Sequence, residues 1–308
     1  MDPQQLKTAV AILFCGLATV AASTGPPARS QSSATGRDYE RSVADWRAKR
    51  EADLKADDGW LTLVGLHWLR DGVNRIGSDP DAEVPLPEGS APRLVGTIAF
   101  GGGVARFTPS PNARVAVNGR PAETQVLRPQ PGDYDVVTTG AVTFFVIRRG
   151  DRYGVRVRDR NSAARREFKA LHWYPVREEY RVTGRYVPHP KPTSLMIANV
   201  LGAIEPWATP GTVTFAVGGR EYTLHPVLDG PDASELFFIF RDLTTGRETY
   251  PGGRFLYAEM PKDGRVVLDF NKAHSPPCAF TPFATCPVPP KQNHLGVRIE
   301  AGELNPHL

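Results

Sequence analysis

The sequence lacks the local motifs by which common enzyme classes are recognised. Its 308 residues contain no G-x-S-x-G, no H-E-x-x-H, no glycine-rich loop followed by Lys and Ser or Thr, and no G-x-G-x-x-G that opens a helix. Such motifs place a nucleophile, a zinc ion or a phosphate group at a fixed turn. Their absence argues against a hydrolase, metalloprotease, kinase or dehydrogenase of familiar type and leaves room only for an unfamiliar active site.

The sequence also has only a small excess of positive charge, and it has only one long apolar run. The formal net charge of +4 is too small to indicate nucleic acid as a partner. One apolar run, Ala9 to Ala22, follows Lys7 and ends in small residues, which predicts a signal peptide over residues 1–22. The run is short for a membrane span. We therefore expect an exported protein, periplasmic or extracellular, with no stable membrane insertion after signal cleavage.

Cysteine is rare, with three residues in the whole chain. Cys15 falls in the predicted signal peptide, so the mature chain keeps Cys278 and Cys286, in the proline-rich stretch PPCAFTPFATCPVPP. An even number of cysteines in an oxidising compartment predicts a disulfide, which would stabilise this loop by roughly 2 to 3 kcal/mol. The alternatives are a zinc site completed by His274 and His294, or a nucleophilic Cys278 with one of these histidines as its base. The spacing is not that of common zinc fingers, and we predict no metal and no cofactor.

Two segments precede the main body of the chain. Residues 23–37 are rich in Ser, Thr, Gly, Pro and Ala, a composition typical of a disordered linker. Over residues 38–58, apolar side chains recur at helical spacing among many charged ones, which predicts one amphipathic helix. These apolar residues are Tyr39, Val43, Trp46 and Leu54.

Beyond residue 58 the pattern changes to short β-branched and aromatic runs such as AVTFFVIRRGDRYGVRVRD, GTVTFAVGGREYTLHPV and ELFFIFRD. Asn118-Gly119, Gly218-Gly219 and the RGD at 149–151 fall between such runs, where tight hairpin turns favour residues that accept a positive φ. The pattern predicts an all-β protein of antiparallel sheets in two lobes, residues 59–148 and 149–308, with the N-terminal helix as its one substantial helix.

The segment from Val73 to Arg148 carries NRIGSDPDAEVPLPEG, then VNG at 117–119 and GD at 132–133. In this order the turns resemble those of a forkhead-associated domain, which implies a β-sandwich for the first lobe. Such domains carry an arginine directly after the IG pair and a Ser-Arg-x-His segment, whereas this chain has Ser78 and Ser90-Ala91-Pro92-Arg93. Without these side chains the charge-assisted hydrogen bonds to a phosphate are missing. We therefore expect a degenerate domain that binds no phosphothreonine peptide.

A second resemblance covers nearly all of the chain after the linker. The phrases DGWLTLVGLHWL, RREFKALHWYP, FIFRDLTTGRETY, GRFLYAEMPKDGRVVLDFNKA and PPCAFTPFATCPVPP closely resemble the bacterial and archaeal family catalogued as domain of unknown function sixteen eighty-four. The resemblance implies a fold with little helix and no established activity. We expect residues 149–308 to form a second β-sandwich or barrel lobe that ends in the proline-rich loop.

Arginine clusters in RYGVRVRDRNS. On a strand, alternate side chains share a face, so one face carries a row of guanidinium groups, those of Arg152, Arg156, Arg158 and Arg160. Such a row is either solvated or paired with acids of a neighbouring strand, or it binds a carboxylate or phosphate, which arginine suits better than lysine.

A second polar set follows the apolar strand LFFIF. It comprises Arg241, Asp242, Thr244, Glu248, Tyr250 and Arg254. Asp269 and Asn271, at the end of the next predicted strand, could face the same side. Polar residues between two such strands often surround the mouth of a barrel or the end of a sandwich, where ligands bind. The alternative is a salt-bridged turn in which Thr244 and Thr245 form local hydrogen bonds.

From these features we predict binding of a small anionic or carbohydrate-like ligand in the second lobe, without a cofactor. The first alternative is a hydrolase that uses Asp242, Glu248 or Asp269 as acid or base and arginines to hold the substrate. The second is a structural or interaction module of the cell envelope. The candidate ligand-binding residues are Arg156, Arg158, Arg160, Arg241, Asp242, Glu248, Tyr250, Arg254, Asp269 and Asn271.

Overall fold

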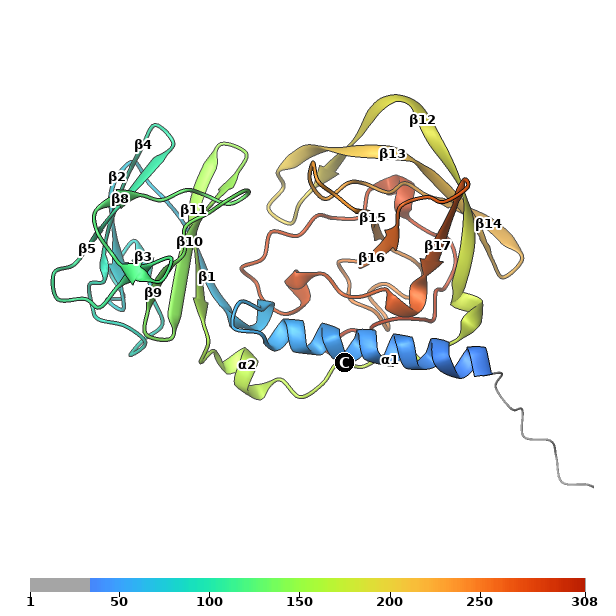
Figure 1. Ribbon diagram of the computed structural model, residues 1–308, viewed down its shortest axis with the longest axis horizontal. Coiled ribbons are helices and arrows are strands. Elements are labelled where there is room, and N and C mark those ends of the chain that lie inside the picture. Colours follow the sequence, from blue (N-terminus) through green and yellow to red (C-terminus); the bar gives the residue numbers. More distant parts are fainter. Residues whose placement is uncertain (1–33, 308) are drawn as a thin grey trace, which may run out of the picture.

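Two β lobes lie side by side in the computed structural model, with one long helix running beneath the second lobe (Figure 1). The structure describes residues 34–307, with side chains from residue 36. The predicted all-β, two-lobed fold with one N-terminal helix is confirmed, although the second lobe is no closed barrel in the part of the chain that the structure describes. The predicted signal peptide lies outside the described residues, as does most of the predicted linker.

The first lobe is a sandwich of two sheets, in which β3 runs parallel to β2 and the other neighbours are antiparallel. One sheet has the order β1-β11-β10-β9-β6-β7, formed by Leu63–Trp68, Arg152–Asp159, Val142–Arg149, Val137–Thr139, Ala116–Val117 and Arg120–Pro121. The other has the order β3-β2-β4-β5-β8, formed by Val84–Pro85, Gly72–Gly77, Gly96–Gly101, Val104–Pro109 and Gln125–Val126.

Strand β11 shows how the sequence pattern positions the two faces of this lobe. Val155 and Val157 are fully buried in the sandwich core, where Phe144 meets Phe107 edge to face. The alternate residues of β11 are the arginines, which therefore point out of the sandwich. The β6–β7 hairpin turns through Asn118 and Gly119, both at positive φ, as the NG pair predicts.

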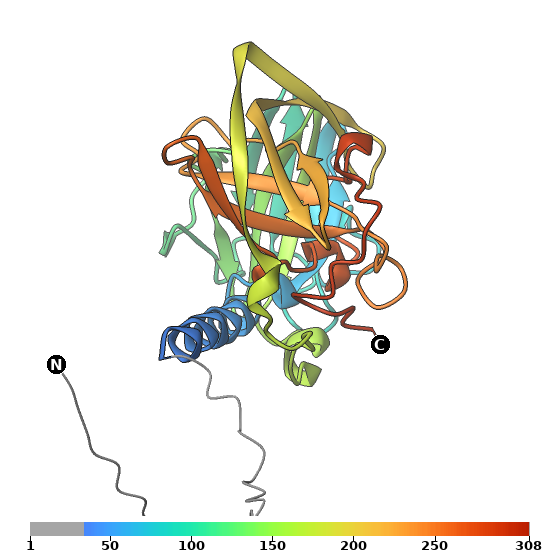
Figure 2. The ribbon, with the colours of Figure 1, turned by 90° about the vertical axis from the view of Figure 1, so that its right-hand side faces the viewer.

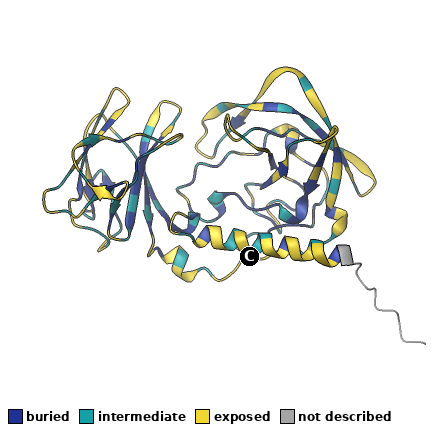
Figure 3. Ribbon diagram, in the orientation of Figure 1, coloured by how far each residue is buried: buried dark blue, intermediate teal, exposed yellow. Residues whose placement is uncertain are grey.

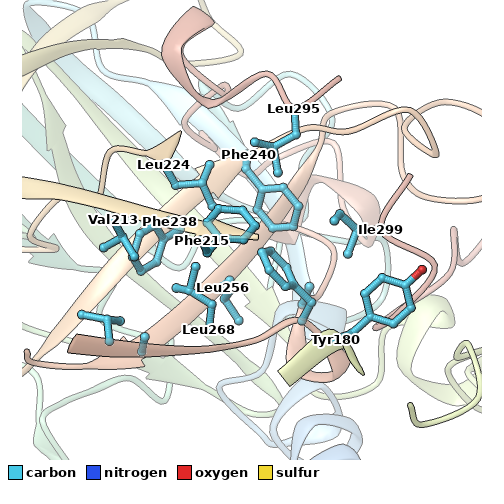
Figure 4. Packing of buried hydrophobic residues seen from close by; sticks show 14 of the residues in the cluster. Tyr180, Val213, Phe215, Leu224, Phe238, Phe240, Leu256, Leu268, Leu295 and Ile299 are labelled. Atoms are coloured by element: carbon cyan, nitrogen blue, oxygen red, sulfur yellow. The ribbon is translucent and has the colours of Figure 1, made fainter. Parts of the chain in front are cut away.

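The second lobe is built around a four-stranded sheet and a separate two-stranded ribbon. The sheet has the order β14-β13-β12-β17, formed by Arg220–Leu224, Ile204–Val217, Arg181–Ala198 and Arg265–Asp269; the ribbon pairs β15 (Glu235–Phe240) with β16 (Arg254–Glu259). The long β12–β13 hairpin arches over the top of the lobe (Figures 1 and 2). Between sheet and ribbon, the side chains of Phe215, Phe238 and Phe240 lie in the main core (Figure 4).

Helix α1 (Ala34–Lys55) packs beneath the second lobe, and from its C-terminal end the chain continues through η1 into strand β1 of the first lobe (Figure 1). Its outer side is exposed (Figure 3), while Val43 and Leu54 are buried on the inner side. Tyr39 Oη donates to Asp269 Oδ1 at 2.7 Å, and Arg50 Nη2 donates to the Ser275 carbonyl at 2.8 Å. No helix in residues 34–307 is long and apolar enough to span a membrane.

The remaining helical elements are short. They are α2 (Ala163–Glu167) and the 3₁₀ turns η1 (Trp60–Thr62), η2 (Glu178–Tyr180), η3 (Phe270–Lys272), η4 (Pro277–Ala279) and η5 (Lys291–Asn293). Three of them, η3 to η5, lie in the C-terminal segment, where the prolines prevent longer regular elements.

Candidate functional site

A cavity of about 1070 Å³ lies between the two lobes. The first lobe contributes the β10–β11 hairpin, residues 129–132 and Trp60; the second contributes parts of β12, β13, β15 and β16 and of the C-terminal loop, while α1 contributes Arg50. This volume suits a small organic ligand. The cavity is therefore not confined to the second lobe, where we predicted the ligand site, because the first lobe also forms part of its wall.

Two arginines converge on one hydroxyl of the second lobe. They lie on β10 and β11, which belong to the first lobe, so this lobe extends beyond the boundary predicted at residue 148. Arg149 Nε donates to Thr285 Oγ1 at 3.3 Å, and Arg156 Nη2 donates to the same oxygen at 3.1 Å. Both arginines line the cavity. Their guanidinium groups are thus held close together by a neutral oxygen that does not offset their repulsion.

Burial makes this arrangement costly. Arg156 is 4% exposed, its Nε has no hydrogen-bond partner, and its guanidinium lies over the Trp60 ring at 5.6 Å. Burial, helped by the nearby positive charges of Arg149 and Arg158, lowers the pKa of Arg156 to about 10. Burial also lowers the pKa of Arg149, although Glu205 opposes the shift. Among the described residues no carboxylate forms an ion pair with Arg149 or Arg156.

The second lobe gives the cavity an aromatic wall. Phe237 and Tyr257 stack with centroids 4.6 Å apart and planes 10° from parallel, and Trp207 packs against Phe237 at 6.2 Å. Tyr257 Oη donates to Asp229 Oδ2 at 3.4 Å. The pKa of Tyr257 is raised mainly by burial and, to a lesser extent, by the negative charge of Asp229. Aromatic faces of this kind suit a flat or apolar ring. The cavity therefore has a cationic end on the first lobe and an aromatic side on the second.

His274 lies against this aromatic wall as an uncharged ring. It is stacked on Tyr257 at 6.1 Å, and its Nδ1 lies 3.2 Å from the Lys272 carbonyl, to which the neutral ring donates. Burial, together with the positive charge of Arg50, lowers the pKa of His274 to about 3. Because the ring stays neutral at ordinary pH, its Nε2 is a hydrogen-bond acceptor on this side of the cavity.

The two cysteines lie next to the arginine pair. Cys286 lines the cavity, and Thr285 immediately precedes it. Both cysteines are free thiols, so the predicted disulfide is not formed in this structure; instead the Cys278 N–H donates to Cys286 Sγ at 3.1 Å. For the zinc alternative, His294 Nε2 is engaged with the Pro289 carbonyl at 3.2 Å. No group of three or more potential metal ligands occurs within residues 34–307.

The predicted arginine row does share one side of β11, but its members have different neighbours. Arg152 lies over Trp68 at 3.9 Å and Arg158 over Phe145 at 5.3 Å, and burial lowers the pKa of Arg158. Arg160 pairs with Asp57 at 3.5 Å. Of this row only Arg156 lines the cavity. The row therefore packs largely on aromatic rings instead of forming a solvated edge or a set of ion pairs.

The second predicted set forms an internal ion-pair cluster. Arg254 and Asp242 have fully buried side chains and are joined at 3.2 Å, and Arg254 Nη2 also donates to the Ile299 carbonyl. Asp242 accepts from the Ile299 N–H at 2.6 Å and from Thr244 Oγ1 at 2.8 Å. The cluster ties the C-terminal strand-like segment to β15 and β16. Of the two interpretations of this set, a ligand-binding mouth or a salt-bridged turn, the contacts fit the salt-bridged turn. None of these residues lines the cavity.

The other candidates also hold the fold together. Glu248 pairs with Arg298 at 2.8 Å, and Asp269 accepts from Tyr39 Oη. Asn271 donates to the Arg177 carbonyl at 2.8 Å. Tyr250 Oη donates to the Cys278 carbonyl at 3.0 Å, while exposed Arg241 contributes its backbone N–H to Asn293. The structure thus leaves the hydrolase alternative without a predicted carboxylate in the cavity.

Several lining residues were missed in the sequence, chiefly Arg149, Thr285, Trp207 and Tyr257. Arg149 had a usable signal. Turning the hairpin at Gly150-Asp151 pairs Arg149 with Arg152 and Phe145 with Arg156, which puts Arg149 on the face of the arginine row. Thr285 had none, because its contact with β10 and β11 spans more than a hundred residues of chain.

Comparisons with known proteins identify a family. Residues 166–304 match the model of a family described as "Protein of unknown function (DUF1684)". This match is shorter than the resemblance noted from the sequence, which began near Trp60. The solution structure of an uncharacterised protein from Haloarcula marismortui is 31% identical, over 46% of this chain and 78% of its own, with a TM-score of 0.39.

Forkhead-associated (FHA) domains are also similar to this chain. The FhaA FHA domain, solved with the intracellular domain of Rv3910, is 24% identical over 30% of this chain and 97% of its own, with a TM-score of 0.22. An FHA domain studied for phosphothreonine-dependent interactions is 27% identical over 32% of this chain and 96% of its own, also with a TM-score of 0.22. No curated protein matches the chain.

Proposed function

Because the chain belongs to the family described as protein of unknown function (DUF1684), whose description gives no activity, we propose from its own residues that it binds a small anionic molecule in the cavity between its lobes. The observation that supports this is the pair Arg149, which is half-buried, and Arg156, which is buried: both donate to Thr285 Oγ1, and neither forms an ion pair with a carboxylate among the described residues. A buried charge without a partner is strongly unfavourable. A bound carboxylate or phosphate would supply the missing charge.

The ligand's anionic group would lie at Thr285, between the two arginines. Arginine donates two parallel N–H bonds to a carboxylate or phosphate, and hydrogen bonds to charged groups contribute about 1.5 to 3 kcal/mol each. Trp60, under Arg156, excludes water from one side of this site. Because Arg156 itself is buried, its charge-assisted bonds are stronger than they would be at the surface.

The rest of the ligand would lie along Trp207, Phe237 and Tyr257. Asp229 and Glu205 also line this region and offer acceptors for hydroxyl groups. A flat body, either an aryl ring or a sugar ring, suits this combination of aromatic faces and polar edges. The carbohydrate-like part of the sequence-based prediction is therefore kept, as a sugar that carries an acidic group.

The two alternatives have less support. A hydrolase based on Asp242, Glu248 or Asp269 would need these carboxylates at the ligand, and each of them is engaged in a contact that holds the fold. An envelope interaction module would need a docking surface, whereas the unusual chemistry of this chain is concentrated inside a cavity. We also propose export, from the apolar run in residues 1–22, and in an oxidising compartment a Cys278–Cys286 disulfide.

The test compares matched arginine variants. Inorganic phosphate, benzoate and glucose 6-phosphate are titrated into the purified chain by isothermal titration calorimetry, with glucose as the neutral counterpart of the sugar phosphate. Arg156→Met and Arg149→Met are each expected to weaken binding of every anion at least about 10-fold, because each variant loses one charge-assisted hydrogen bond to the ligand. Arg152→Met, on the same strand but outside the cavity, is the control and should bind as the wild type does.

Three results would count against the proposal. Binding of glucose as tightly as glucose 6-phosphate would show that the charge is not recognised. Equal losses in Arg152→Met and Arg156→Met would place the effect outside the cavity. The absence of binding for all three anions at millimolar concentration would reject an anion site of this kind.

A further inference from the structure

The loop from Cys278 to Cys286 is directly connected to the anion site. Thr285, whose hydroxyl accepts from both arginines, is the residue before Cys286. Cys286 is buried and lines the cavity, whereas Cys278 is half-buried and does not line it. Any change in the position of Cys286 therefore moves the oxygen on which Arg149 and Arg156 converge.

The two thiols are already neighbours in this structure. The Cys278 N–H donates to Cys286 Sγ at 3.1 Å, and the thiol of Cys278 points to the Ala284 carbonyl at 3.6 Å. A hydrogen bond between the two sulfurs lowers the pKa of Cys278 and raises that of Cys286. The pair thus has one thiol suited to attack and one buried thiol suited to complete the exchange.

The loop does not need a disulfide to stay folded. Tyr250 Oη donates to the Cys278 carbonyl at 3.0 Å, and the Val200 N–H donates to the Cys286 carbonyl at 3.0 Å. In the middle of the loop, Thr281 Oγ1 donates to the Leu63 carbonyl at 2.9 Å. Both ends and the centre are anchored while the thiols are free, so a link between them has a role other than holding the loop.

We propose that Cys278 and Cys286 are a reversible redox couple that regulates the anion site, with the linked form binding the anion more tightly. The regulatory half of this proposal rests on the proposed function, whereas the redox half does not. The oxidant belongs to the class of small-molecule or protein disulfides, which exchange with thiols without a metal or a bound cofactor.

The exchange balances in two steps. The Cys278 thiolate attacks one sulfur of the oxidant disulfide, which forms a mixed disulfide and releases one thiolate. Cys286 then gives up its proton and displaces the second thiolate by attacking Cys278 Sγ, which closes the Cys278–Cys286 bond. In total the protein loses two protons and two electrons, and the oxidant takes them up to become two thiols.

Charge explains why the linked form should favour the anion. Whenever Cys278 of the reduced protein is deprotonated, the negative charge of its thiolate is attracted to Arg156 and competes with the ligand for the same guanidinium. A disulfide carries no charge, and Arg156 is then left with the ligand as its only anionic partner. Linkage makes the effect reciprocal: a tenfold gain in anion affinity on oxidation means that the bound anion lowers the reduction potential by about 30 mV.

The experiment uses the full chain with Cys15→Ser, so that the third cysteine forms no mixed disulfide. The protein is equilibrated in buffers of reduced and oxidised glutathione, free thiols are alkylated, and the linked fraction is read by mass spectrometry. Phosphate is then titrated into the fully reduced and the fully oxidised protein. We expect a single two-electron transition and roughly tenfold tighter phosphate binding after oxidation, which would disappear in the Cys278→Ser/Cys286→Ser variant.

Each outcome decides one half of the proposal. Cysteines that stay unlinked across the whole glutathione range reject the redox couple. A disulfide that forms while reduced and oxidised protein bind phosphate equally rejects the regulation and keeps the couple. A disulfide that forms while neither state binds any anion rejects the proposed function and with it the regulation. Arg156→Met separates the two halves further, because it should form the disulfide normally yet lose the redox dependence of binding.

Discussion

Arg254 in the second lobe and Arg156 in the first are both buried, but their guanidinium groups have very different partners. The terminal nitrogens of Arg254 reach Asp242 and the carbonyls of Ala301 and Ile299. Those of Arg156 reach one hydroxyl, that of Thr285. The Nε atom lacks a partner in both side chains, so the difference lies in the counter-charge.

This difference separates a structural arginine from one that is available to a ligand. A buried cation that faces a carboxylate and two carbonyls is neutralised within the fold, and removing it leaves a carboxylate buried without a partner. A buried cation without a carboxylate weakens the fold, because desolvation is not offset. Burial alone therefore does not identify a binding residue, whereas burial without a counter-charge at the wall of a cavity is what we expect of an arginine that binds an anion.

The largest effect is expected when the satisfied arginine is removed. Arg254→Met leaves Asp242 charged in a site with no solvent, and breaking a buried pair in this way costs about 3 to 5 kcal/mol. Urea denaturation followed by circular dichroism measures the loss in free energy of unfolding. The double variant Arg254→Met/Asp242→Leu should recover part of it, because no charge is then left unpaired. A single variant as stable as the wild type would contradict the structural role of this pair.

A second effect concerns His274, which is buried near Arg50 but uncharged. Its pKa is about 3 in the folded protein and about 6.5 in the unfolded chain, so between these values the unfolded state binds the extra proton. Stability is therefore fully present above pH 6.5 and falls as the pH drops toward 3, by up to about 1.4 kcal/mol per pH unit.

The measurement is the urea stability of wild type and His274→Asn between pH 5 and 6.5, above the range in which most carboxylates titrate. Burial also lowers the pKa of His67 and of His225, which act in the same direction, so the quantity to compare is the difference in slope between the two proteins. Parallel slopes would mean that His274 is protonated in the folded state.

The fold was largely readable from the sequence, and the site was not. Period-two runs such as that around Val155 and Val157, together with turns such as Asn118-Gly119, depend on neighbours in the chain and predict strands and hairpins directly. Whether Asp242 meets Arg254 or a ligand depends on how the C-terminal segment packs against β15 and β16, which no local pattern contains. The cavity likewise joins β10 to Thr285, far apart in sequence, and composition gives no sign of such a contact.

Removing Arg156, which has no carboxylate partner, should change the free energy of unfolding little. Any change should be opposite in sign to the loss expected for Arg254→Met. Arg156→Met replaces a buried, unpaired charge by an apolar chain of similar length, and such exchanges are neutral or stabilising. We expect the free energy of unfolding without ligand to stay within about 1 kcal/mol of wild type or to rise, while stabilisation by added phosphate is lost. Arg152→Met serves again as the control. Destabilisation as large as that of Arg254→Met would mean that Arg156 has an internal partner and is no ligand-binding residue.

The smallest effect is expected for an arginine that is exposed and already paired. Arg93 lies in the segment whose sequence we compared with the phosphate-binding segment of forkhead-associated domains; its side chain is 78% exposed and it pairs with Asp79 at 2.8 Å. Ser78 Oγ, at the position where an arginine is usual, donates to the Ala91 carbonyl. Exposed ion pairs contribute about 0 to 1 kcal/mol, so Arg93→Ala should be nearly as stable as wild type. Phosphothreonine peptide arrays should show no more binding than unphosphorylated controls with either protein. If the wild type binds phosphopeptides selectively and Arg93→Ala abolishes this binding, an exposed, paired arginine is functional. The rule that an arginine paired with a carboxylate is structural, drawn from Arg254 and Arg156, would then not hold at the surface of the first lobe.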